Sequence, residues 1–78
     1  MKINILLNEI SKINRFVSVV NQFESDVDIS KNRYLVNGKS IMGIYSLDLS
    51  EPVVVHIHNT NNEELEKFKE VMEEFRVD

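Results

Sequence analysis

The chain has 78 residues, a length that suits one domain near the lower limit at which a single hydrophobic core can hold a fold. It contains no cysteine, which excludes disulfides, thiolate metal sites and thiol catalysis. The formal net charge of −4, without any cluster of Lys and Arg, argues against nucleic acid as a partner. The apolar run 3–7 is too short for a signal peptide or a membrane span, so we expect a cytoplasmic protein.

The first third of the chain predicts a strand followed by a helix. Apolar residues at Ile3, Ile5 and Leu7 alternate with their neighbours, which is typical of a strand. Apolar residues then recur at a helical spacing, at Ile13, Phe16, Val17 and Val20. Ser11 stands just before this stripe, and we expect its hydroxyl to cap the helix.

The middle of the chain predicts a β-hairpin. Val27 and Ile29 alternate with polar residues, the polar segment 31–33 follows, and a second short apolar run occupies 34–36. Two short strands joined by a tight polar connection form such a hairpin.

The last third predicts a strand and a final helix. The strand covers the apolar residues of 53–57 and begins after Pro52, where a missing N–H does little harm. Asn61 or Asn62 is expected to cap the helix, with acidic residues in its first turn. Its apolar face comprises Leu65, Phe68, Val71, Met72 and Phe75.

A brief apolar segment between the hairpin and the last strand completes the pattern. It reads Ile-Met-Gly-Ile-Tyr over 41–45 and follows Ser40. With this segment as a short second helix, the element order is β-α-β-β-α-β-α in a single domain, 1–78. We therefore predict an α+β fold, a two-layer open-faced sandwich with helices on one face of the sheet and water on the other.

The residues Lys39-Ser40-Ile41-Met42-Gly43, followed by Ser46-Leu47, resemble the regulatory-serine motif of the HPr family, the small phosphocarriers of the sugar phosphotransferase system. The resemblance implies a four-stranded antiparallel sheet of order 1-4-2-3. It also implies that a dedicated kinase phosphorylates Ser40. The implied partner-binding residues are Lys39, Ile41, Met42 and Tyr45, and the implied core residues are Ile44, Leu47 and Leu49. The alternative is that Ser40 is only a helix cap and that Ile41 and Met42 are half-buried core.

The phosphorylated histidine of the HPr family lies at the start of the first helix, before an arginine and a proline. The corresponding segment 8–13 reads NEISKI and contains none of these residues. Alignment without gaps from the serine motif puts Glu9 at the histidine position, whereas a small deletion puts Ser11 there. Neither side chain can form the labile phosphoramidate of a carrier histidine. This pattern most resembles Crh, the HPr paralogue that lacks the histidine and keeps the serine.

The histidines of the chain, His56 and His58, lie two residues apart on the predicted fourth strand. Alternation places both on the face opposite Val55 and Ile57, which is the solvent side of the sheet. They could supply half of a zinc site, but the sequence identifies no third ligand. We therefore expect solvent-facing residues and no metal.

Two function classes remain open. The first is an HPr-like regulatory module that binds a protein partner, namely a kinase, a regulator or a phosphotransferase component. The second is a divergent phosphocarrier that uses Glu9, Ser11, His56 or His58. We expect neither an enzyme nor a cofactor, because no catalytic constellation or phosphate-binding glycine loop is present.

Overall fold

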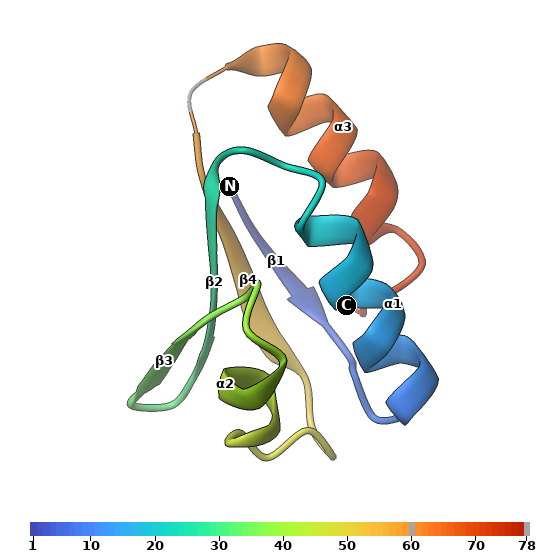
Figure 1. The fold of residues 1–78 in the computed structure, drawn as a ribbon, viewed down its shortest axis with the longest axis vertical. Coiled ribbons are helices and arrows are strands. Elements are labelled where there is room, and N and C mark those ends of the chain that lie inside the picture. Colours follow the sequence, from blue (N-terminus) through green and yellow to red (C-terminus); the bar gives the residue numbers. More distant parts are fainter. Residues whose placement is uncertain (60, 78) are drawn as a thin grey trace.

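The computed structural model describes residues 1–59 and 61–77, which form one four-stranded sheet and three helices (Figure 1). The elements in chain order are β1 (Lys2–Ile5), α1 (Ile10–Val20), β2 (Asp26–Lys31), β3 (Tyr34–Asn37), α2 (Ile41–Tyr45), β4 (Val53–His58) and α3 (Asn62–Met72). The predicted order β-α-β-β-α-β-α is confirmed. In the part of the chain that the structure describes, no helix is both long enough and apolar enough to span a bilayer.

The sheet is antiparallel throughout, and its strand order is β1-β4-β2-β3. The helices cover one of its faces, and α1 contacts α2 there. This arrangement confirms the predicted open-faced sandwich. Its cause is the alternation within the strands, since Val53, Val55 and Ile57 of β4 are buried while the residues between them are partly exposed.

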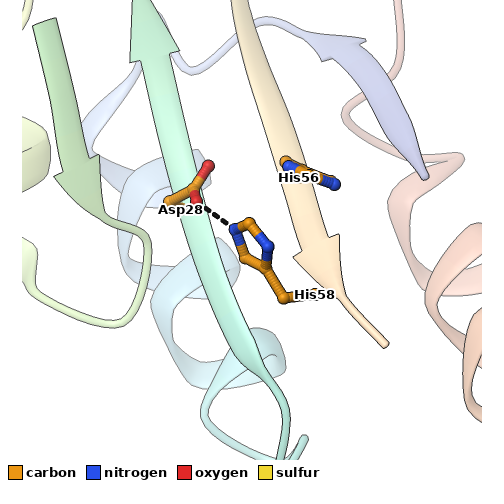
Figure 2. A group of neighbouring side chains, drawn as sticks. All are labelled: Asp28, His56 and His58. Atoms are coloured by element: carbon orange, nitrogen blue, oxygen red, sulfur yellow. Dashed lines mark hydrogen bonds and ion pairs between the residues drawn. The ribbon is translucent and has the colours of Figure 1, made fainter. Parts of the chain in front are cut away.

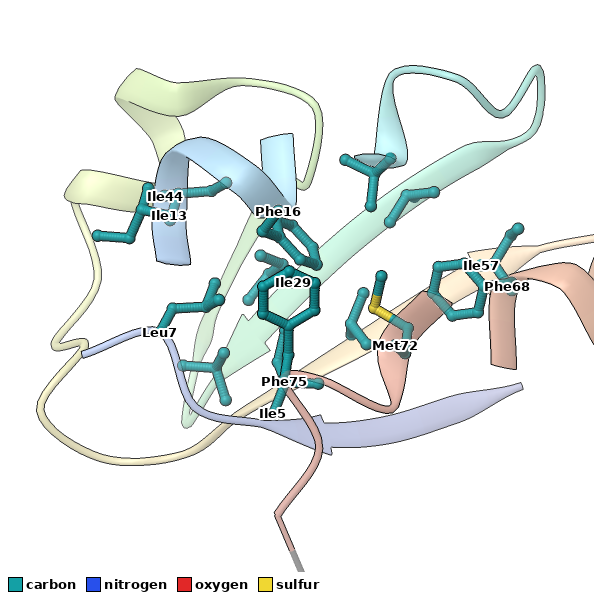
Figure 3. Close-up of a cluster of buried hydrophobic side chains, with 14 of the residues drawn as sticks. Ile5, Leu7, Ile13, Phe16, Ile29, Ile44, Ile57, Phe68, Met72 and Phe75 are labelled. Atoms are coloured by element: carbon teal, nitrogen blue, oxygen red, sulfur yellow. The ribbon is translucent and has the colours of Figure 1, made fainter. Parts of the chain in front are cut away.

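The hydrophobic core lies between the sheet and the helices (Figure 3). Phe16 of α1 meets Phe75 edge to face, with ring centroids 5.6 Å apart, and Phe23 meets Phe68 in the same way at 5.7 Å. Such edge-to-face pairs stabilise the core beyond the free energy gained from the apolar area that the rings bury. No side-chain N or O atom is buried without a partner among the described residues.

The hairpin has a two-residue turn, because Lys31 of β2 pairs directly with Tyr34 of β3. Asn32 in this turn has a φ of 55°, a left-handed conformation that asparagine tolerates better than most residues. The predicted hairpin is confirmed, and the turn chemistry explains its position.

The predicted cap of α1 is wrong. The helix begins at Ile10, so Glu9 occupies the N-cap position and Ser11 lies inside the first turn. The Glu9 side chain makes no capping hydrogen bond. The sequence suggested Ser11 because the buried stripe starts only at Ile13, whereas Ile10 is 68% exposed.

The predicted helical face of α3 extends too far. The helix ends at Met72, and Phe75 is buried from the turn that follows it. The segment after the helix pairs with the first strand region, because the Leu6 N–H donates to the Phe75 carbonyl at 2.9 Å and the Val77 N–H to the Asn4 carbonyl at 2.9 Å. These bonds satisfy backbone groups on the free side of β1.

Candidate functional site

Ser40 is the N-cap of the five-residue helix α2. Its backbone is extended, and its Oγ accepts a hydrogen bond from the Gly43 N–H at 3.2 Å. The side chain is half-buried rather than sealed beneath another element. The hydroxyl oxygen therefore stabilises the start of α2 while the residue keeps some contact with solvent.

The apolar residues of α2 divide between the core and the surface. Ile44 is fully buried, whereas Met42 is 78% exposed and Tyr45 is 47% exposed. Ile41 takes an intermediate place, half-buried and packed against the core. Ile41 was implied as a partner-binding residue, with half-buried core as the alternative, and it is only partly accessible to a partner.

The two leucines that follow α2 point inward, as the resemblance implied. Leu47 belongs to the core with an exposure of 8%, and Leu49 is half-buried against it. This inward set fixes α2 to the domain and leaves Met42 on the outside.

Lys39 has an intramolecular contact that the sequence did not suggest. Its Nζ donates a hydrogen bond to the backbone carbonyl of Phe23, in the loop after α1. The Asn21 side chain also donates to the Lys39 carbonyl at 3.4 Å. The start of α2 is therefore tied to the C-terminal end of α1.

The N-terminal end of α1 lies near the other end of the α2 segment. A shallow hollow is lined there by Glu9 and Ile10 together with Leu49 and Ser50, which follow α2. Helix α1 has 11 residues, which corresponds to a length of about 16 Å. Glu9 and Ser11 therefore lie roughly one length of α1 away from the end at which Ser40 stands. The structure therefore keeps Ser40 apart from Glu9 and Ser11, the other candidate phosphorylation positions.

The histidines of β4 lie on the open face, as alternation predicts. His56 is half-buried and His58 is exposed, and their ring centroids are 4.1 Å apart. Asp28 of β2 is paired directly with His56 in the sheet. Its carboxylate hydrogen-bonds to Nε2 of His58, as the dashed line in Figure 2 marks.

Asp28 is a residue that sequence reasoning missed. One signal was available, because Asp26 and Asp28 alternate with the apolar residues of β2 and so belong to the solvent face. That signal does not say which residues of β4 lie opposite them. Only the register of β2 and β4 brings Asp28 to the two histidines.

The pKa of His56 is lowered from the ordinary imidazole value. The main cause is burial, which disfavours the charged ring, and positive charge on His58 acts in the same direction. The Asp28 carboxylate raises the pKa and opposes both effects. His56 therefore favours its neutral form.

The fold and the capped serine define a class, that of small open-faced α+β proteins with a short second helix beside the first. Residues 11–76 match the family described as PTS HPr component phosphorylation site. The phosphocarrier protein HPr of Neisseria meningitidis serogroup A is 36% identical over 56 residues, which cover 72% of this chain and 63% of the relative. The serogroup B protein gives the same values. The match thus spans less than two thirds of these relatives' length.

Two solved structures have the same fold and are both described as HPr. The crystal structure of HPr-C-His from Thermoanaerobacter tengcongensis has a TM-score of 0.75 at 27% identity, covering 95% of this chain and 91% of that one. The HPr structure from Bacillus anthracis str. Ames has a TM-score of 0.64 at 27% identity, covering 87% of both chains. The chain belongs to the HPr family of the phosphotransferase system.

Proposed function

We propose that this protein is a regulatory, protein-binding member of the HPr family, phosphorylated at Ser40 and docking on a larger protein through α2. One observation carries the proposal. Glu9 is the N-cap of α1 and Ile10 and Ser11 open its first turn, whereas both histidines of the sequence stand on β4. The end of α1 at which the family has its phosphorylated histidine therefore offers no imidazole.

The chemistry of the available groups supports a role other than carrier. A phosphoramidate on imidazole transfers its phosphoryl group readily, whereas a serine phosphate is a poor donor. A glutamyl phosphate would need protection from water, and Glu9 is exposed. The histidines on β4 occupy a different element, on the sheet face away from the helices.

The surface of α2 supports the docking part of the proposal. Met42 at 78% exposure and Tyr45 at 47% exposure give this short helix an apolar exterior. Exposed apolar side chains beside polar ones are common at sites of protein–protein contact. Lys39, by contrast, is held by the Phe23 carbonyl, so we expect it to position α2 rather than to reach a partner.

Phosphorylation of Ser40 would act as a switch on this surface. A phosphate adds roughly −1.5 to −2 charges at neutral pH and three strong acceptor oxygens. The charge would appear two residues before the exposed Met42, so it would change which protein surfaces can dock there. The partner would be the kinase itself, a regulator or a phosphotransferase component.

The proposal is tested by incubating the purified chain with an HPr serine kinase and ATP, followed by mass spectrometry. We expect one phosphate, lost in Ser40→Ala and retained in Ser46→Ala. Ser46 is a matched control, because it caps the other end of the same helix. Met42→Lys should weaken binding of the kinase without unfolding the chain. A phosphate that persists in Ser40→Ala would contradict the assignment.

A second function, a divergent phosphocarrier, is favoured by the names of both curated relatives, which are phosphocarrier proteins. It is tested with phosphoenolpyruvate and the general phosphotransferase enzyme that charges HPr. We expect no acid-labile phosphoprotein. Label that survives His56→Ala and His58→Ala but disappears in Ser11→Ala or Glu9→Gln would establish the carrier function instead.

A further inference from the structure

We propose that Asp28, His56 and His58 form a binding site for a divalent transition-metal ion, with zinc as the best fit, on the open face of the sheet. Each of the three residues offers one ligand atom, and these atoms all lie within 4.8 Å of one another (Figure 2). No other group of this kind occurs within 1–59 and 61–77. The site is independent of Ser40 and α2, which belong to the helical layer.

The backbone register holds the three side chains together. Asp28 is paired directly with His56, and His58 follows two residues later on the same face of β4. Both strands are interior to the sheet, because β4 lies between β1 and β2, and β2 between β4 and β3. Ligands on such strands keep their relative positions better than ligands on loops.

The distances suit a single ion after small side-chain movements. Zinc bonds to imidazole nitrogen and carboxylate oxygen at about 2.0–2.2 Å, so in a tetrahedral site two ligand atoms lie about 3.3–3.6 Å apart. The present limit of 4.8 Å exceeds this spacing, so the side chains would have to close in by roughly 1–1.5 Å around the ion. In Figure 2 the His58 ring points toward Asp28, and the ion would replace the hydrogen bond between them.

The ligand set fits zinc chemically. Two neutral imidazoles and one carboxylate are a common zinc set, and the fourth position would be open to water or to another ligand. Calcium and magnesium prefer oxygen ligands, so a site with two imidazoles disfavours the binding of these ions.

Charged groups of both signs surround the site. Asp26 is paired directly with His58 and so lies on the same face, where it adds a second carboxylate. Lys2 of β1 is paired directly with His56, and Lys2 and the N-terminal ammonium are the opposing cations. An ion bound here would link β2 to β4 and stabilise the folded chain.

The alternative is an ordinary surface pair between Asp28 and His58. Such a pair explains the position of the His58 ring, since it accounts for one hydrogen bond. This pair does not involve His56, although the ring of His56 lies beside that of His58 with centroids 4.1 Å apart. A shared ion would use all three side chains at once.

The test is a titration of the untagged, metal-free chain with zinc chloride, monitored by calorimetry. Thermal unfolding is then measured with and without zinc. We expect saturation at one zinc per chain and a rise in the melting temperature. His56→Gln, His58→Gln and Asp28→Asn should each weaken zinc binding at least about tenfold, since even indirect ligand contacts are worth 10–100-fold. Glu66→Gln is the control for Asp28→Asn, because it also replaces a carboxylate by an amide, but at an exposed position on α3.

The proton NMR signals of the imidazole rings give a second measurement, for which the chain's only histidines are ideal. Zinc should shift the signals of both rings together. The proposal is overturned if zinc neither binds saturably nor shifts both rings. It is equally overturned if Asp28→Asn binds zinc as tightly as the unchanged chain, or if one zinc is shared by two chains.

Discussion

Asp28 lies directly opposite His56 across the antiparallel pair of β2 and β4. The carboxylate nevertheless hydrogen-bonds to His58, the next histidine on that face, rather than to its direct neighbour. His56 is half-buried beside the ring of His58, and burial lowers its pKa. The open face therefore combines a carboxylate with two imidazoles of different environment.

The lowered pKa of His56 predicts a pH dependence of stability in the metal-free chain. The unfolded chain binds a proton at His56 more readily than the folded chain, in the window between the folded pKa and about 6.5. The free energy of unfolding should therefore decrease as the pH falls from about 7.5 through this window. Urea unfolding with a chelator present measures the effect.

Two variants isolate the contribution of His56. His56→Gln should remove its part of the decrease, so the stability of this variant should fall less on acidification. His58→Gln removes a positive neighbour and should raise the pKa of His56 toward the ordinary value. An unchanged pH profile in His56→Gln would contradict the prediction.

The helix caps predict effects of different size at two serines. Ser40→Ala removes the hydrogen bond to the Gly43 N–H and should cost about 0.5–2 kcal/mol of stability. Ser11→Ala should change stability by less than about 0.5 kcal/mol, because Ser11 is exposed and does not cap α1.

Glu9 offers a further check on the start of α1. Its side chain makes no capping bond, so Glu9→Ser should stabilise the chain, by about 0.5–1 kcal/mol. Chemical unfolding measures all three variants. A larger loss for Ser11→Ala than for Ser40→Ala would mean that α1 begins later than Ile10.

Met42 and Leu47 should differ sharply in their effects on folding. Met42→Lys should leave stability nearly unchanged, because the side chain is 78% exposed. Leu47→Ala should cost about 2–5 kcal/mol, because the side chain is 8% exposed and its loss leaves a cavity in the core. Thermal unfolding compares the two, and an equal loss would show that Met42 packs against the domain.

The two glycines predict opposite outcomes on replacement by alanine. A Cβ on Gly43 would lie 3.4 Å from the nearest Val36 atom, which is ordinary contact, so the higher helix propensity of alanine should stabilise α2 by up to about 1 kcal/mol. A Cβ on Gly38 would lie 2.9 Å from Cγ1 of Val27 and 3.1 Å from its carbonyl oxygen. Gly38→Ala should therefore destabilise the chain, and the reverse order in unfolding experiments would refute this account.

The sequence by itself determined the kinds of element and most of their places. Alternation at Val53, Val55 and Ile57 predicted β4 and its buried face, and the capping residues Ser40 and Asn61 stand at the starts of α2 and α3. These features were predictable because each depends on residues close together in the chain. Strand order is not local, and it came from the resemblance to a family.

The tertiary structure alone decided the contacts between distant segments. It started α1 at Ile10 without a side-chain cap, tied Lys39 to Phe23, and paired Phe75 with Leu6. It also set the register that joins Asp28 to the histidines of β4. Alternation fixes the face on which a side chain lies, but the residue opposite it depends on how all the elements pack together.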